Sequence, residues 1–505
     1  MFQTAVGEKV TLLLKSLKKS IERRPCLSLY VGGLVATLNY VVALIAIPGG
    51  AEIFHAPYGF YDGQYWLNTD AINYVRPAKY FLSHGAFLDY LGGALVPSHW
   101  GVCVPLDGIN SPEQLTPRLT PTYHRVIGYS LIIAIFMKSF GPYWDLILAA
   151  FNVFAFAFIY PLLFLIAKLI FPSKWNTAFI VWPFLFLLIC GTYIYQVPFY
   201  LADMTVTLLF LTGIYFGLKS QLHLRWVDLL GHVFFLSLAC LVKSILSYFV
   251  FVDLLVLASF AYRRGTLKKP KSRLFIVLSF LAILLASQFS FIRNYVNHQR
   301  YMPEDILATN LFCYLAREVA QLAGDEQRYV EGIKDLYKVD PTDVAALDAN
   351  KIEKTREIIY RYPATSGYVL FQHALTVLYR SHLHLFGRTL VQRPYSTLLW
   401  VILFPLNYLL YTFLYAAFLM FCLRLVWQKE FLLLATLAVL VGYMFVPTIL
   451  TAGGSRMRLP FEGLIVIVAF AEVYNRTVGV VGSGPRAHVF WVRRLFHGKK
   501  EGAVE

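Results

Sequence analysis

The chain has 505 residues, of which 58% are apolar, 16% aromatic and 15% charged. Ordinary soluble domains have roughly 25% charged residues, so this composition excludes a soluble enzyme. The contents of 32 Gly, 23 Pro and 6 Cys also exclude a disordered or collagen-like chain and a disulfide scaffold. We therefore expect an all-α polytopic membrane protein, because helices of about 20 apolar residues cross roughly 30 Å of hydrocarbon. The net charge of +16 fits cationic loops held in the cytoplasm better than it fits a nucleic-acid partner.

Basic residues predict that both ends of the chain lie in the cytoplasm. The first 25 residues carry six Lys and Arg and precede the apolar run Cys26–Ile47, which is too long for a signal-peptide core. Six more cations lie within residues 263–273, and the segment 476–505 is basic again. By the positive-inside rule, residues 1–25 and 476–505 are cytoplasmic, so the number of membrane spans is even.

Ten apolar runs satisfy this parity, which predicts about 10 transmembrane helices. The apolar segment Val126–Met137 has only twelve residues and is shorter than the ~17 that a span requires. We expect it to form a short interfacial or re-entrant helix in the outer leaflet. The ten predicted spans are Cys26–Ile47, Tyr143–Phe171, Thr177–Tyr195, Met204–Leu218, Val227–Val242, Leu246–Tyr262, Leu274–Ile292, Thr397–Leu423, Phe431–Ile449 and Leu459–Val473.

Two long polar segments then face the extracytoplasmic side. Residues 48–125 form the first external loop of an N-terminal transmembrane module, 26–292, to which we assign the chemistry because loops of this length are commonly functional. Residues 293–394 form a second external loop with helix-forming composition, and 395–475 form the C-terminal transmembrane helices. Within the second loop, Tyr368–Arg388 reads as a surface-lying amphipathic helix with histidines on its polar face. These histidines are His373, His382 and His384.

Acidic residues in the first external loop are the main candidates for chemistry. Asp70 is followed at +4, +8 and +12 by Tyr74, Ala78 and Leu82, which predicts an apolar stripe on a helix that starts at an acid. An acid at this position either caps the helix or has a functional role. Asp62 stands in a Tyr-Asp-Gly sequence, where a turn is the simpler interpretation.

Four short patterns occur in a fixed order along the chain. The first is the series Asp70, Tyr74, Ala78, Leu82 and Gly85, which fits D-x3-Y-x3-A-x3-L-x2-G. The second begins with Arg125 and includes Gly128 and Tyr129; it fits R-x-P-G-Y-P…F-G, except that Ile127 and Ser130 replace both prolines. The third and fourth are Arg293-Asn294-Tyr295 and Arg456-x-Arg458-Leu459-Pro460.

Together these patterns resemble the GT-C superfamily of membrane glycosyltransferases, particularly protein O-mannosyltransferases and aminoarabinose transferases. The resemblance implies a GT-C-like fold and a polyprenyl-phosphate sugar as donor, and it gives Asp70 the catalytic acidic role. Asp203 stands where the related oligosaccharyltransferases have a second external acid, so the resemblance makes it a second catalytic candidate. The motif residues Tyr74, Arg125 and Tyr129, together with Asp62, are then expected to bind substrate.

Cations at the outer boundary are candidates for holding the donor phosphate. Arg456 and Arg458 lie where the positive-inside bias disfavours them, and a guanidinium fork suits phosphate oxygens. Lys243 ends the fifth span and Arg293 follows the seventh, at the same predicted surface. Alternatively, Arg458 pairs with Glu462 one turn on, and the Lys243 side chain extends to lipid headgroups.

The expected reaction is displacement at the anomeric carbon of the donor sugar, with inversion. Asp70 would act as general base toward an acceptor hydroxyl. Toward an acceptor phosphate, Asp70 would position the sugar or bind a divalent cation, Mg²⁺ or Mn²⁺, together with Asp203. The expected partners are a polyprenyl-phosphate-linked sugar, membrane lipid and an acceptor glycan, lipid or protein. The active site would lie on the extracytoplasmic side of the inner (plasma) membrane.

Two other functions and one pairing stay open. A polyprenyl-linked glycan ligase or polymerase would share the chemistry but take a larger donor. A lipid or sugar transporter would need a polar passage, and the intramembrane charges are few and lie near span ends or alone. Cys103 and Cys313 are the two external cysteines and either pair or stay reduced. The intramembrane charges are Asp145, Lys168, Asp228 and Asp253.

Overall fold

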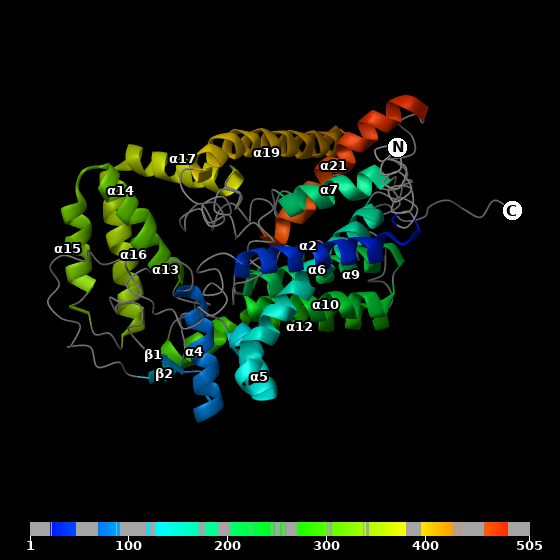
Figure 1. Ribbon diagram of the computed structural model, residues 1–505. Helices are drawn as coiled ribbons and strands as arrows, with labels where there is room; N and C mark the ends of the chain where they lie inside the picture. Colours follow the sequence, from blue (N-terminus) through cyan, green and yellow to red (C-terminus); the bar gives the residue numbers. More distant parts are fainter. Residues whose placement is uncertain are drawn as a thin grey trace.

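In the residues that it describes, the regular structure of the computed structural model is helical apart from one two-stranded ribbon (Figure 1). It describes residues 21, 23–46, 69–86, 88–90, 119–121, 127–170, 177–189, 202–223, 225–243, 246–247, 253–254, 258, 270–299, 301, 306–336, 338–339, 343–379, 395–427, 434 and 459–482.

Eight of the ten predicted spans coincide with helices in the described part of the chain. The other two, Leu246–Tyr262 and Phe431–Ile449, lie almost entirely outside the described residues, so the total of about 10 spans stays a prediction. The eight helices are α2 (Pro25–Ala46), α6 (Trp144–Ile170), α7 (Thr177–Ile189), α9 (Ala202–His223), α10 (Trp226–Val242), α12 (Pro270–His298), α19 (Tyr395–Trp427) and α21 (Leu459–Gly482).

Among the described residues, four helical segments are long and apolar enough to cross a membrane: 127–170, 202–220, 276–297 and 405–427. Large apolar side chains stand exposed along these helices, for example Leu285 on α12 and Leu409 on α19. Exposed leucines along a long helix are costly in water and favourable in lipid. The chain is therefore an integral, multi-pass membrane protein.

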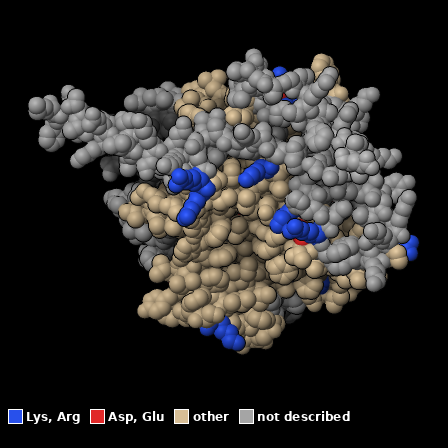
Figure 2. Space-filling model, turned by 90° about the vertical axis from the view of Figure 1, so that its right-hand side faces the viewer, with Lys and Arg blue, Asp and Glu red and all other residues tan. Residues whose placement is uncertain are grey.

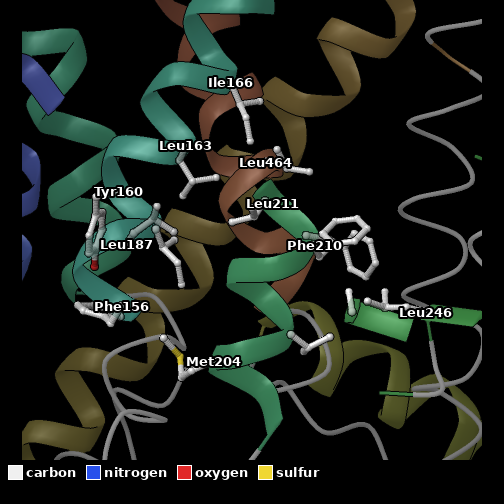
Figure 3. Packing of buried hydrophobic residues seen from close by; sticks show 14 of the residues in the cluster. Phe156, Tyr160, Leu163, Ile166, Leu187, Met204, Phe210, Leu211, Leu246 and Leu464 are labelled. Atoms are coloured by element: carbon white, nitrogen blue, oxygen red, sulfur yellow. The ribbon is translucent and has the colours of Figure 1, made fainter. Parts of the chain in front are cut away.

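The bundle is held together by apolar side chains of α6, α7, α9 and α21. Leu163 of α6, Leu187 of α7, Phe210 and Leu211 of α9, and Leu464 of α21 are all buried and lie in one cluster (Figure 3). These residues belong to runs that are apolar on all sides, as is typical of helices packed within a membrane bundle. The first turn of α9 is packed into the same cluster through Met204.

Two shorter helices lie across one end of this bundle. α4 (Thr69–His84) and α5 (Ile127–Phe140) run across the direction of α9 and α10 (Figure 1). Gly141 has φ +55° and starts a 3₁₀ turn, 141–143, which separates α5 from α6. The predicted short helix at 126–137 is thus a separate helix. A small ribbon of β1 (Leu88–Tyr90) and β2 (Leu119–Pro121) follows α4, with Leu88 opposite Pro121.

The second long loop contains a helical unit with its own core. Phe312, Val319, Ile333, Ile358 and Val369 are buried in one apolar cluster, separate from that of the bundle. Figure 1 shows α14, α15 and α16 at the end of the molecule opposite the last turns of α21. The unit comprises α13 (Ile306–Asn310), a π-helical turn (Leu311–Ala316), α14 (Arg317–Leu322), α15 (Glu326–Leu336), α16 (Val344–Arg361) and α17 (Pro363–Tyr379).

Helix α12 continues to His298, so Arg293 and Asn294, where the second external loop is predicted to begin, are helical. One expectation for this part of the chain is wrong. His373 is buried and its Nε2 atom is 2.8 Å from Oε2 of Glu318, so it does not belong to an exposed polar face. A carboxylate on α14 provides the partner that makes burial of this imidazole favourable.

Gly128 is expected to be intolerant of a side chain. A Cβ atom there would lie 2.3 Å from the carbonyl oxygen of Leu241 on α10. Gly128→Ala should therefore lower the free energy of unfolding by about 1–3 kcal/mol. Gly367→Ala on α17 is the matched control, since nothing lies within 4 Å of the added carbon. Thermal unfolding of both variants in detergent checks this, and equal stabilities would show that α5 and α10 do not pack closely.

Candidate active site

The centre of the candidate site is an ion pair between Asp203 and Lys243. The ammonium group of Lys243 donates a hydrogen bond to Oδ1 of Asp203. The two residues are 40 positions apart in the sequence, and their side chains are only 6% and 14% exposed. Because burying either charge alone is costly, each side chain stabilises the other in this position.

The ends of two helices hold this pair. Asp203 lies in the first turn of α9, and Lys243 directly follows the last residue of α10. An acid at the start of a helix and a cation at its end both interact favourably with the helix dipole. The Lys243 backbone is extended, and its N–H donates to the carbonyl of Ala239, so the side chain leaves α10 at a defined point.

A third helix, α5, packs on the backbone of α10 close to Lys243. Gly128 of α5 packs directly on the peptide of Leu241, two residues before Lys243. The next residue, Tyr129, is fully buried, and its ring lies edge-on to that of Tyr74 on α4, with 5.1 Å between ring centroids. Tyr74 and Tyr129 thus connect α4 to the first turn of α5, which packs on the last turn of α10.

Asp70 lies one helical turn before Tyr74, in the first turn of α4. The predicted helix starting at this acid is confirmed, while the orientation of the Asp70 side chain is outside the described residues. The structure therefore brings the helix that carries Asp70 together with the predicted site residues Tyr74, Tyr129, Asp203 and Lys243.

Arg293 lies on α12 with its guanidinium fixed by a neighbour. Its Nε and Nη2 atoms donate to Oδ1 of Asn294, at 2.9 and 2.6 Å. Asn294 is completely buried, so its amide holds the guanidinium in one orientation. Arg293 lies near the C-terminal end of α12, and among the described residues no contact links it to the Asp203–Lys243 pair.

The remaining predicted residues are only partly placed. Glu462 accepts a hydrogen bond from the hydroxyl of Tyr411 at 2.5 Å, which gives this buried acid a partner on α19. Four predicted site residues lie outside the described part of the chain, and their assigned roles stay predictions: Asp62, Arg125, Arg456 and Arg458.

Sequence reasoning missed several buried polar pairs. Asp253 was expected to be isolated, but its Oδ2 lies 2.8 Å from Nε2 of the buried His232. Asp228 pairs with Lys219 at 3.2 Å. A single apolar-looking helix gives no signal for such pairs, because the partners are separated by up to 21 positions and meet only when helices pack.

The described part of the site does not fit a divalent cation. The ammonium group of Lys243 occupies the position beside Oδ1 of Asp203 that a metal would take, and two cations there would repel each other. Among the residues that the structure describes, no three His, Cys, Asp or Glu side chains are grouped to hold a metal. The steps proposed below use none.

No family model and no curated protein matches this sequence. A solved structure that does match is the archaeal oligosaccharyltransferase AglB from Archaeoglobus fulgidus, in complex with an inhibitory peptide and a dolichol-phosphate. The match has a TM-score of 0.45 and 12% identity, and it covers 94% of this chain and 54% of that chain. This chain thus spans about half the length of the matched protein. Such a likeness does not assign a family, and the proposals below depend on the residues of this chain.

A double-mutant cycle tests the ion pair. Lys243→Met leaves a buried carboxylate without its cation, so it should cost about 3–5 kcal/mol of unfolding free energy. Adding Asp203→Asn should recover part of this loss, giving a coupling energy of roughly 1–3 kcal/mol. Chemical unfolding in detergent measures all four proteins.

The pair Arg328–Glu357 is the control for this cycle. Both of its side chains are 38% exposed, and the shortest charged contact is 3.8 Å. Its coupling energy should not exceed about 1 kcal/mol. Equal coupling in the two pairs would contradict a buried Asp203–Lys243 interaction.

Proposed function

We propose that the chain is a GT-C-type glycosyltransferase that transfers a sugar from a polyprenyl-phosphate carrier to an acceptor outside the cytoplasm. The observation that carries this proposal is the Asp203–Lys243 pair, which joins the start of α9 to the end of α10. At that end α10 packs on α5, and α5 contacts the acid-bearing helix α4. An acid beside a fixed cation at the end of an apolar bundle suits a substrate with an anionic head and a hydrocarbon tail.

The reaction is a single displacement. An acceptor oxygen forms a bond to the anomeric carbon while the bond from that carbon to the phosphate oxygen breaks. When the acceptor is a hydroxyl group, its proton passes to the Asp70 carboxylate. The electron pair of the broken bond leaves with the polyprenyl phosphate, and attack from the opposite side inverts the anomeric configuration.

The leaving phosphate gains negative charge during this step, so fixed cations stabilise the transition state. The Lys243 ammonium has three hydrogens, of which one is directed to Asp203. The other two donate to phosphate oxygens of the carrier, while Asp203 holds the amine in place. Arg293, Arg456 and Arg458 complete the proposed phosphate-binding group.

Two features support the proposed orientation in the membrane. Cys313, in the helical unit 306–379, is disulfide-bonded, and disulfides persist mainly outside the cytoplasm. Its partner lies outside the described residues, so pairing with Cys103 stays a prediction. Figure 2 faces the opposite end of the molecule, and several Lys and Arg side chains stand out among the described residues of that face. Exposed cations at the predicted inner helix ends are Lys168, Arg225 and Arg273.

Removal of the Asp70 carboxylate should abolish sugar transfer. Asp70→Asn is expected to lower turnover by about 10²–10⁴-fold, because the amide cannot accept the acceptor proton. Release of polyprenyl phosphate from a panel of polyprenyl-phosphate monosaccharides measures this. The control is Asp145→Asn, which changes another helix-start acid whose carboxylate accepts from the Leu146 N–H. Wild-type turnover in the Asp70 variant would reject its assigned role.

Loss of the late arginines should weaken carrier binding. Arg456→Ala and Arg458→Ala are each expected to reduce affinity for polyprenyl phosphate about tenfold, because each removes a charge-assisted contact. Fluorescence titration with a labelled short-chain polyprenyl phosphate measures the affinity. Arg356→Ala, an exposed position on α16, is the control. If all three variants bind alike, the two arginines do not contact the phosphate.

A further inference from the structure

One buried imidazole contacts two other segments of the chain. His232 lies on α10, and its side chain is only 1% exposed. Its Nδ1 atom is 2.8 Å from the carbonyl oxygen of Gly213 on α9, and its Nε2 atom is 2.8 Å from Oδ2 of Asp253. The reaction proposed above does not use this cluster.

These two contacts define how many protons the cluster holds. A carbonyl oxygen only accepts hydrogen bonds, so Nδ1 of His232 carries a hydrogen. On the other side of the ring, Nε2 faces a carboxyl oxygen, and two lone pairs 2.8 Å apart repel each other unless a proton lies between them. His232 and Asp253 therefore share one proton, and the pair as a whole is neutral.

Glycines enclose the imidazole between the two helices. A Cβ atom on Gly217 of α9 would lie 2.7 Å from Nδ1 of His232. On α10, a Cβ atom at Gly231 would lie 2.9 Å from the ring of Phe216. The helices are thus as close as glycine permits, and the imidazole cannot shift without moving one of them.

Each of the two helices has one of its ends at the candidate active site. Asp203 lies in the first turn of α9, and Lys243 follows the last residue of α10. Asp253 comes ten residues after Lys243 in the sequence. The imidazole therefore ties together the helix before Lys243, the chain after it and the helix that carries its partner acid.

We propose that His232 and Asp253 are positioning residues that hold Lys243 against Asp203, and so set the affinity for the carrier phosphate. This inference rests on the function proposed above. The tie requires a hydrogen bond between the two side chains, not a charge on either, because the pair is neutral overall.

Binding of a labelled short-chain polyprenyl phosphate to the purified full chain tests the proposal. Asp253→Leu removes the hydrogen bond, and we expect about tenfold weaker binding. Asp253→Asn should stay within about threefold of wild type, because its amide donates to Nε2 of a neutral imidazole. Asp228→Asn is the matched control. Asp228 is a buried acid like Asp253, but it lies on α10 and its partner is Lys219 on α9, so we expect wild-type binding.

Two results would overturn the proposal. One is wild-type binding by a folded Asp253→Leu protein. The other is equal weakening in the Asn and Leu variants, which would mean that charge and not the tie is required. Folding is followed by circular dichroism and gel filtration in detergent.

Nitrogen NMR of protein labelled with ¹⁵N-histidine keeps the proposal testable if Asp253→Leu does not fold. The difference between wild type and Asp253→Asn should show one imidazole whose Nε2 loses a shared proton, and identical spectra would overturn the tie. Wild-type carrier binding and turnover in Lys243→Met would reject the proposed role of Lys243 without changing this spectrum. The two failures are therefore distinguishable.

Discussion

A charge buried in an apolar bundle is stable only with a partner close by, and this constraint governs the polar architecture of the protein. Asp203 meets Lys243, Asp253 meets His232, and each of these contacts joins segments that are distant in sequence. The acid Glu472 of α21, completely buried, likewise binds the guanidinium of Arg424 on α19 at 2.8 Å. Polar pairs thus act as ties between helices whose other contacts are apolar.

Glycine is the second element of this arrangement. Gly128 lets α5 rest on the backbone of α10, and Gly217 leaves space for the imidazole of His232. Small residues at such contacts allow two backbones to approach closely, as is common between membrane helices. The candidate site is accordingly built on rigid helix ends, and α4 is attached to them through the contact of Tyr74 with Tyr129.

Most of the helices were predictable, because long apolar runs are easily recognised in the sequence and indicate membrane helices. The run Val227–Val242 became α10 with a shift of one residue at its start, and a helix does begin beside Asp70. Asp203 and Lys243 were each predicted as site residues for separate reasons. Their contact was not predicted, because no local pattern relates residues 40 positions apart.

Other features were out of reach for the same physical reason. His373 has the spacing of a polar-face residue, and only the packing of α14 against α17 brings Glu318 to it. Asp253 looked isolated because its partner is on another helix. Amphipathic patterns indicate which side of one helix is polar; they do not tell whether that side faces water or a complementary group.

Photo-cross-linking tests directly whether the phosphate of the carrier binds beside Asp203 and Lys243. A polyprenyl phosphate with a photoreactive group next to the phosphate is bound to the full chain in lipid vesicles, and labelled peptides are identified by mass spectrometry. We expect labels in α4, in the first turn of α5 and around Lys243. These labels should disappear when excess unlabelled polyprenyl phosphate competes. Competed labels confined to the opposite end of the bundle, around Arg424 and Glu472, would contradict binding at this site.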